Sequence, residues 1–305
     1  MKCAISSEKG MALIITLLIT AILVAVITEV VYTVHTHAMI IEDFKDGQRA
    51  EMLAEGGVKL AVMGLNEMMK GKTYTAFAPD QSKQVIPEGD GVLTIQIVDE
   101  EGKFPANSIV FQNGETHDKM YAAYLRLVEA AGFSDDLADT LADWIDIDDE
   151  PRPMGAETYD YYSELDPPYS AKNAPLDSVD EMMLIKGYTQ QVYGKLSPLV
   201  TVYSDGLINI NTAPREVLMA LSRDITAELA DRAIEYRNNT PFQNTADIRN
   251  VSGFETIGFS RQDKITVKSG VFRIYSRAKV GEGIRDVEAV VTTSNGGHVL
   301  YWRER

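Results

Sequence analysis

An uninterrupted apolar segment near the N-terminus constrains this chain more than any other feature of its sequence. Segment 11–28 carries no charge and is mostly Ala, Val, Ile and Leu, and Glu29 is the only ionised residue from there to position 34. At about 1.5 Å per residue, a helix of this length crosses the roughly 30 Å hydrocarbon core of a bilayer. Lys2 and Lys9 precede the segment, which predicts that this end faces the cytoplasm and the bulk of the chain lies across the membrane.

Three kinds of N-terminal segment share this pattern: a secretory signal peptide, a plain signal anchor and the leader of a prepilin-like protein. A secretory signal peptide is disfavoured because the apolar run is too long and no small-x-small cleavage site follows it. The junction Lys9-Gly10-Met11 resembles the processing site of prepilin-like proteins, in which a peptidase cuts after the glycine. This resemblance implies that residues 1–10 are a leader and that Met11 becomes the methylated mature N-terminus. A plain signal anchor is the remaining alternative.

The fifth residue after the proposed cleavage site departs from the usual pattern of pilins and pseudopilins. Most of them have glutamate there, whereas this chain has Ile15. In those families the glutamate pairs with the free amine of the subunit ahead of it, inside lipid, where an unpaired charge is costly. A subunit with no other ahead of it needs no such glutamate. In lacking this glutamate, the chain resembles the K-type minor pseudopilin of bacterial type II secretion systems.

Beyond the apolar segment, the helix is expected to continue and to present one apolar face to a sheet. The residues of this face are spaced by 4, 3, 4 and 4 positions and are Leu53, Gly57, Leu60, Gly64 and Met68. Gly71, Pro79 and Pro87 are expected to end the helix and bound a polar loop. Alternating apolar residues then predict antiparallel strands at 93–97, 272–279, 287–291 and 298–302.

Between the two strand regions, residues 118–264 show helical rather than strand periodicity. We therefore predict an α+β fold, with a long N-terminal transmembrane, pilin-like helix and an antiparallel sheet interrupted by a large all-α insertion. The K-type resemblance implies the same architecture. The predicted divisions are leader 1–10, transmembrane helix 11–34, pilin-like helix and first strands 35–117, inserted helical domain 118–264, and remaining strands of the pilin-like domain 265–305.

The chain is strongly acidic, with a formal net charge of -16 from 45 acidic and 29 basic residues. This charge repels nucleic-acid phosphates and anionic lipid headgroups, so cations and basic surfaces are the expected partners. Much of the charge is local, because residues 135–166 contain 12 acidic side chains and a single base, Arg152. Such a density indicates either a solvated acidic face or a cation site.

The oxygen-rich segment 143–160 is the candidate cation site. Calcium takes six to eight oxygen ligands at about 2.3–2.6 Å, which a carboxylate-rich loop can supply. The spacing does not match an EF-hand, which needs a central glycine and a closing glutamate. The residues alone therefore favour a solvated acidic face over a metal site.

The core Trp144-Ile145-Asp146, followed by Gly155-Ala156-Glu157, resembles the tract associated with calcium binding in the K-type family. This resemblance implies a structural calcium ion. Asp143 is expected to be used in helix-terminal hydrogen bonds. The candidate ligands are Asp146, Asp148, Asp149, Glu157 and Asp160.

The segment 209–242 resembles a helix-hairpin-helix domain, a motif that often grips the DNA backbone. Its first helix is expected to have Thr212 as N-cap and Pro214 in the first turn. The hairpin at 222–225 lacks the glycine pair that favours a close backbone approach to phosphate. A structural role is therefore preferred, and DNA binding by a minor pilin of a competence or type IV pilus system is the alternative function.

No sequence motif indicates catalysis, so an enzyme is not expected. The four histidines are scattered, and Cys3, the only cysteine, lies in the proposed leader. By resemblance, the chain is a minor pseudopilin at the tip of the type II secretion pseudopilus, where it initiates or caps assembly for export of folded proteins. Its implied partners are the I-type and J-type pseudopilins, the prepilin peptidase and the inner membrane, with no nucleic acid. The C-terminal domain is expected in the periplasm.

Overall fold

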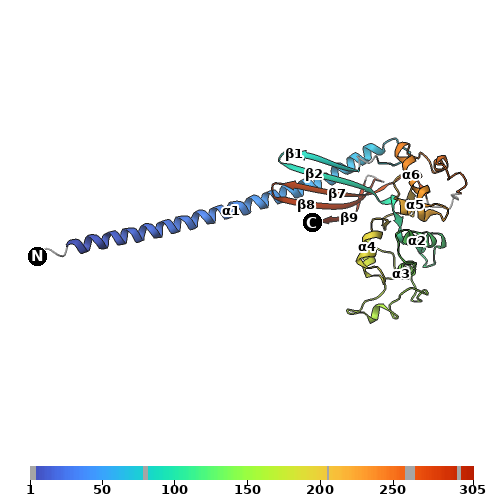
Figure 1. The fold of residues 1–305 in the computed structure, drawn as a ribbon, viewed down its shortest axis with the longest axis horizontal. Helices are drawn as coiled ribbons and strands as arrows, with labels where there is room; N and C mark the ends of the chain where they lie inside the picture. Colours follow the sequence, from blue (N-terminus) through green and yellow to red (C-terminus); the bar gives the residue numbers. More distant parts are fainter. Residues whose placement is uncertain (1–4, 78–81, 205, 258–264, 294–296) are drawn as a thin grey trace.

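One very long helix and a five-stranded sheet form the frame of the molecule. The computed structural model describes residues 5–77, 82–204, 206–257, 265–293 and 297–305, with residues 5–9 described by their backbone alone. Lys2, Cys3, Pro79 and the predicted insertion boundary at 264 lie outside these residues. Helix α1 (Ile5–Met69) projects far beyond the rest of the chain at its N-terminal end, whereas its C-terminal end packs on the sheet (Figure 1).

The sheet has the antiparallel strand order β1-β2-β7-β8-β9. The predicted strands are confirmed as β2 (Gly91–Asp99), β7 (Val271–Val280), β8 (Gly283–Thr292) and β9 (His298–Glu304). Strand β1 (Lys83–Glu88) lies where the sequence predicted a polar loop. That prediction was wrong because Pro87 was expected to bound a polar loop after the helix, whereas proline is compatible with an edge strand such as β1.

Helix α1 packs on one face of the sheet through small side chains. The fully or nearly fully buried residues of this face are Ala50, Ala54, Val58, Ala61 and Leu65. Gly57 also belongs to it, because a Cβ there would lie 2.2 Å from Ser276 Oγ and 2.8 Å from Leu93 Cδ1. The face that packs on the sheet therefore lies slightly around the helix from the predicted one. Leu60 is 46% exposed, and a Cβ on Gly64 would meet nothing within 4 Å.

A second compact unit is inserted between the neighbouring strands β2 and β7 (Figure 1). Its helices are α2 (Asp118–Ala130), α3 (Asp136–Ile145), α4 (Gln190–Leu196), α5 (Arg215–Leu221) and α6 (Ala227–Asn239). Short 3-10 turns lie at η1 (Glu100–Gly102), η2 (Ala106–Ile109), η3 (Tyr162–Glu164), η4 (Val179–Leu184) and η5 (Thr245–Asn250).

The insertion is not wholly helical. Strand β3 (Phe104–Pro105) pairs in parallel with β4 (Val200–Thr201), and β5 (Ile208–Asn209) pairs in parallel with β6 (Ile265–Thr266). These two-residue strands are too short to give a strand periodicity in the sequence. They tie the chain entering and leaving the insertion to its interior.

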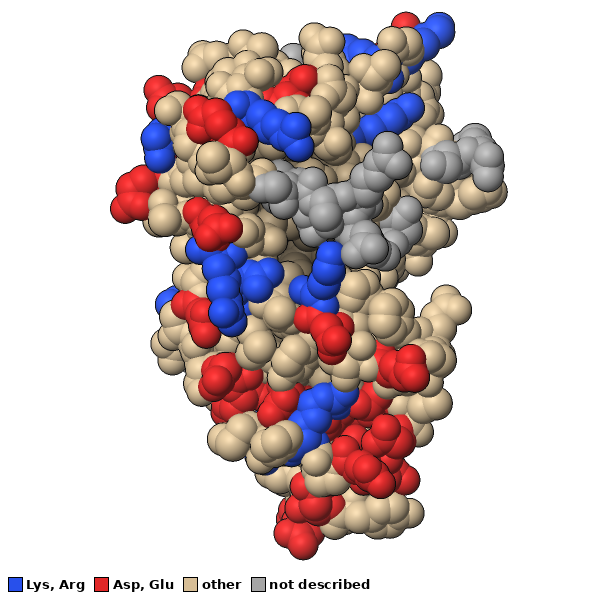
Figure 2. Space-filling model, turned by 90° about the vertical axis from the view of Figure 1, so that its right-hand side faces the viewer, with Lys and Arg blue, Asp and Glu red and all other residues tan. Residues whose placement is uncertain are grey.

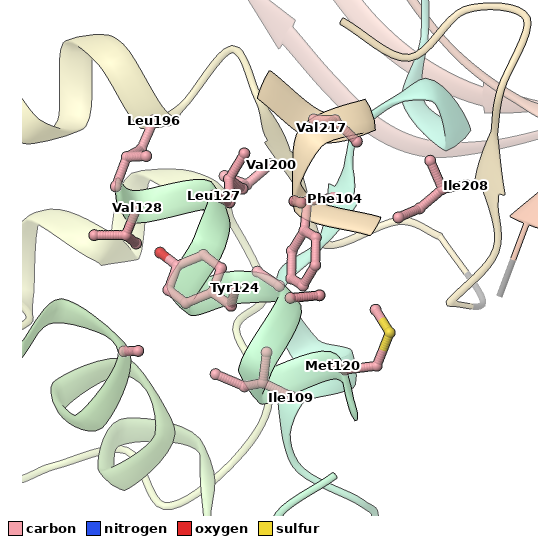
Figure 3. Packing of buried hydrophobic residues seen from close by; sticks show 14 of the residues in the cluster. Phe104, Ile109, Met120, Tyr124, Leu127, Val128, Leu196, Val200, Ile208 and Val217 are labelled. Atoms are coloured by element: carbon pink, nitrogen blue, oxygen red, sulfur yellow. The ribbon is translucent and has the colours of Figure 1, made fainter. Parts of the chain in front are cut away.

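The insertion has its own hydrophobic core, separate from the core between α1 and the sheet. Figure 3 shows the centre of this core, where Phe104 and Tyr124 lie close together, with Leu127 and Val200 nearby. Phe104 and Ile109 belong to this core, although the sequence assigned residues 35–117 to the pilin-like part. The compact unit thus begins at Phe104, which follows η1 and Lys103, and not at Asp118.

A buried polar network joins the insertion to the sheet. The carboxylate oxygen Oδ2 of Asp99, at the end of β2, accepts hydrogen bonds from Asn209 Nδ2 at 3.0 Å, Thr212 Oγ1 at 2.6 Å and Ser269 Oγ at 2.6 Å. Burial raises the pKa of Asp99 above its usual value, against these hydrogen bonds. Thr212 was predicted to be the N-cap of α5, but its hydroxyl bonds Asp99 instead, and Pro214 holds the N-cap position.

Candidate functional site

The N-terminal half of α1 is the first candidate site. Gly10 lies within the continuous helix, and Met11 and Ile15 are 59% and 51% exposed on it. In the part of the chain that the structure describes, α1 is the one helix long and apolar enough to cross a membrane, and its apolar window has no buried residue. The molecule thus presents an apolar rod with nothing of its own packed around it.

The exposed apolar surface of α1 extends past the predicted membrane segment. Large side chains beyond position 34 remain open to solvent on this helix, among them Met39, Ile40, Ile41, Phe44, Met52 and Met63. Four of these six precede Ala50, where the buried face of the helix begins, whereas Met52 and Met63 lie within the stretch that packs on the sheet and are exposed on its other side. Exposed apolar surface of this extent is typical of a helix that packs against other proteins.

The acidic loop after α3 is the second candidate site, and Figure 2 shows acidic side chains gathered over the end of the insertion where this loop lies. Arg152 organises the loop. Asp143, fully buried, accepts hydrogen bonds at Oδ2 from the backbone N–H groups of Arg152 (3.1 Å) and Ala156 (2.9 Å). The Arg152 guanidinium bridges Asp143 Oδ1 and Asp146 Oδ2, both at 2.5 Å. Gly155 permits this close wrapping, since a Cβ there would lie 1.7 Å from Asp143 Oδ2. The bonds of Asp143 thus hold the loop and not the end of the helix.

Two carboxylates of this loop keep buried oxygens without a hydrogen-bond partner. They are Oδ1 of Asp146 and both Oε1 and Oε2 of Glu157, whose residues are 2% and 1% exposed. Burial raises the pKa of Asp146 to about 6, in spite of Arg152. Burial, followed by the charges of Asp143, Asp146 and Asp149, raises the pKa of Glu157 to about 8. A buried carboxylate without donors is costly, and a bound cation would remove that cost.

Asn173 brings a further unpartnered oxygen to the same loop. It is the one described non-glycine residue with a positive φ, 48°. Its side-chain Nδ2 donates to the carbonyl oxygen of Asp148 at 3.0 Å and to Asp149 Oδ1 at 3.1 Å, which leaves its buried Oδ1 without a partner. The sequence reasoning did not include Asn173 among the ligands, because its amide is neutral and its backbone conformation is not visible in the sequence.

The remaining predicted ligands are exposed and have one oxygen each in a local hydrogen bond. Asp148 Oδ1 accepts from the Glu150 N–H at 2.9 Å, and Asp160 Oδ1 accepts from the Glu157 N–H at 2.7 Å. Across the described residues, no three His, Cys, Asp or Glu side chains converge into a metal-binding group. The unpartnered oxygens come instead from two acids and one amide, a donor set of the kind calcium accepts, so the residues present fit a hard cation.

The class of the protein follows from these observations together. An apolar, protruding helix whose C-terminal half packs on an antiparallel sheet is a pilin-like anchor and head. Sequence profiles described as "Type II secretion system (T2SS), protein K" match residues 102–205 and 208–268, which together span more than half of the chain. The chain therefore belongs to the protein K family of type II secretion and is a minor pseudopilin with a single-pass membrane anchor.

Similar proteins support this assignment along the chain. The type II secretion system protein K of Pseudomonas aeruginosa is 28% identical, over 79% of this chain and 75% of its own length. That of Aeromonas hydrophila is 26% identical, over 97% and 96% of the two chains. The fold also matches a chain in "the GspK-GspI-GspJ complex from enterotoxigenic Escherichia coli", with a TM-score of 0.71 at 19% identity, over 87% of this chain and 99% of that one.

Proposed function

We propose that this pseudopilin occupies the tip of the pseudopilus, where it initiates or caps assembly for the export of folded proteins. The observation that carries the proposal is Ile15, which offers no carboxylate to the amine of a subunit ahead of it. Placing this chain inside the shaft would leave that amine unpaired in or near lipid. The protein thus acts through assembly contacts and not through catalysis.

The shape of the head supports the same position. The insertion lies at the end of the molecule opposite the N-terminus, beyond the sheet (Figure 1). A shaft subunit must stack closely between neighbours above and below it, and this bulk obstructs stacking on the distal side. At the tip, the distal side has no neighbour.

Its partners are proposed to be the other minor pseudopilins, because the similar solved chain assembles with GspI and GspJ. The exposed apolar residues of α1 provide the surface for helix packing with them. The prepilin peptidase is expected to cut between Gly10 and Met11, with the anchor in the inner membrane and the head in the periplasm. Family membership favours this function over DNA binding by a minor pilin.

A structural calcium ion is proposed in the acidic loop of the insertion. Asp146, Glu157 and Asn173 supply its buried ligands, and exposed oxygens of Asp148, Asp149 and Asp160 are available to complete it. The ion would supply the divalent positive charge that this buried group of carboxylates lacks. Arg152 neutralises the other side of the loop by bridging Asp143 and Asp146.

Labelling of assembled pseudopili tests the tip position. A gold label on this chain is expected at one end of each filament, in one copy. Ile15→Glu should leave the label at the end, because the bulk of the insertion still prevents stacking. Label at regular intervals along the filament would refute the proposal.

A further inference from the structure

A groove on the open face of the sheet differs in charge from the rest of the molecule. The side chains of β7 alternate, so that Phe272 and Ile274 face α1 whereas Arg273, Tyr275 and Arg277 face away from it. Two adjoining hollows of about 340 and 350 Å³ lie on this open face and share Tyr275, Glu288, Arg303 and Arg305. One hollow extends to β1, and the other passes the edge of β9 to reach α4.

The groove is basic although the chain carries a net charge of -16. Its lining contains six basic and three acidic side chains, and four tyrosines. Two of the acids are already used within the sheet: Glu288 pairs with Arg273, and Asp286 pairs with both Nε and Nη2 of Arg277. Three of the bases are used in the same pairs, because Arg273 and Lys103 also bind the buried carboxylate of Glu100 and Arg277 binds Asp286. The positive charge left for a ligand is that of Lys83, Arg303 and Arg305.

Arg303, on the edge strand β9, lines both hollows and is the central basic side chain available to a ligand. Its nearest acid is Asp180 at 3.7 Å, and the two side chains are 43% and 60% exposed, so the pair is weak and screened. Among the described ion pairs, none engages Lys83 or Arg305 at the neighbouring positions of the groove. Arginine in a preformed hollow recognises carboxylates with two parallel hydrogen bonds.

Arg273 is held in the wall of the groove by several contacts. The Arg273 guanidinium lies 5.5 Å from the ring centroid of Tyr203 and 5.9 Å from that of Tyr301. Its Nε also donates to the buried carboxylate of Glu100 at 2.8 Å. Tyrosine and arginine held in this way are the residues that dominate binding energy in protein interfaces.

We propose that this groove binds an extended acidic segment of another protein. Charge complementarity selects the carboxylates, the tyrosines supply apolar contact area, and the edge strand β9 offers backbone groups to an extended chain. Because the groove lies on the sheet face opposite α1, it stays open when α1 packs against other helices. The inference goes beyond the tip position and applies equally to the free protein.

Fluorescence anisotropy with the full chain in detergent tests the proposal. The probe is a short fluorescein-labelled peptide of alternating glutamate and threonine, compared with its glutamine counterpart and with single-stranded DNA of equal charge. The glutamate peptide is expected to bind, to bind more weakly as salt rises, and to outbind both comparison probes.

Arg303→Gln should weaken peptide binding about tenfold, the scale of one charge-assisted hydrogen-bonded contact, and Arg303→Lys should weaken it less. Arg249→Gln is the matched control, since it removes the same charge from an exposed position on η5 outside the groove. Thermal melting of each variant checks the fold. Failure of the peptide to bind, or equal losses in the Arg303 and Arg249 variants, would overturn the proposal. Preferential, Arg303-dependent binding of DNA would assign the groove to nucleic acid instead.

Discussion

At the scale of single residues, Glu157 combines burial with a lack of hydrogen-bond donors, and its pKa is raised to about 8. Its ordinary pKa is about 4.3, so between these values the folded, calcium-free protein binds a proton that the unfolded chain does not. Without calcium, stability contributed by this group is therefore present at low pH and is lost as pH rises toward 8. A divalent cation should reverse that loss, and its binding should release a proton.

We predict that calcium raises the melting temperature and does so more at pH 8.5 than at pH 6. Glu157→Gln should abolish most of the calcium effect while leaving the calcium-free protein as stable or more stable at high pH, because no buried charge forms. Differential scanning calorimetry in chelator and in calcium measures both effects. Glu150→Gln is the control, since Glu150 is exposed in the same run. If neither chelator nor calcium changes the melting temperature, the acidic run is a solvated surface and not a cation site.

Gly10 carries a second prediction at this scale. Its position meets no other atoms within 4 Å, so Gly10→Val should not disturb the folded head. It should nevertheless block processing, because a branched side chain replaces the small residue next to the scissile bond. Mass spectrometry of the membrane-extracted protein should show an N-methylated Met11 in the parent and the unprocessed N-terminus in the variant. Detection of residues 1–10 on the mature parent chain would contradict the assignment.

At the scale of elements, the contact between α1 and the sheet depends on one glycine. Gly57→Ala should destabilise the fold by about 1–3 kcal/mol, because the added Cβ would lie 2.2 Å from Ser276 Oγ, which already donates to the Ala54 carbonyl. Gly64→Ala is the matched control on the same helix, where nothing lies within 4 Å. It should stabilise by up to about 1 kcal/mol through helix propensity. Denaturant unfolding of the two variants gives the comparison, and equal effects would show that Gly57 makes no close contact.

The elements also show where sequence reasoning succeeds and where it stops. Strands β2, β7 and β8 each bury alternate residues against α1, so a period of two marks them in the sequence. Strand β1 is exposed along most of its length and lacks that mark. The acidic run was visible as a candidate cation site, but the unpartnered oxygens of Glu157 and Asn173 depend on how distant parts of the loop fold together. Burial of this kind is a tertiary property that no local pattern encodes.

At the scale of the whole molecule, two hydrophobic cores are joined by polar contacts rather than by a shared apolar interior. Asn209 is the centre of this junction: the two hydrogens of its Nδ2 are shared among Thr75 O at 3.0 Å, Asp99 Oδ2 at 3.0 Å and Ser269 Oγ at 2.8 Å. These three acceptors come from the end of the α1 region, from β2 and from the chain that returns to β7. One amide thus connects the three segments at which the insertion meets the sheet.

Asn209→Ala should therefore loosen the two units from each other without emptying either core. The Thr75 carbonyl loses the Asn209 donor and the Asn211 N–H loses its acceptor, Asn209 Oδ1, and each buried group left unsatisfied costs about 1–3 kcal/mol. Asp99 Oδ2 loses one donor but keeps Thr212 and Ser269. We expect a lower melting temperature and a wider separation between the unfolding of the insertion and that of the sheet, seen by calorimetry as two transitions. Asn239→Ala is the control, because its amide makes only an exposed bond to the Glu235 carbonyl. A single transition with the parent's midpoint in Asn209→Ala would mean that apolar contacts, and not this network, couple the head to its insertion.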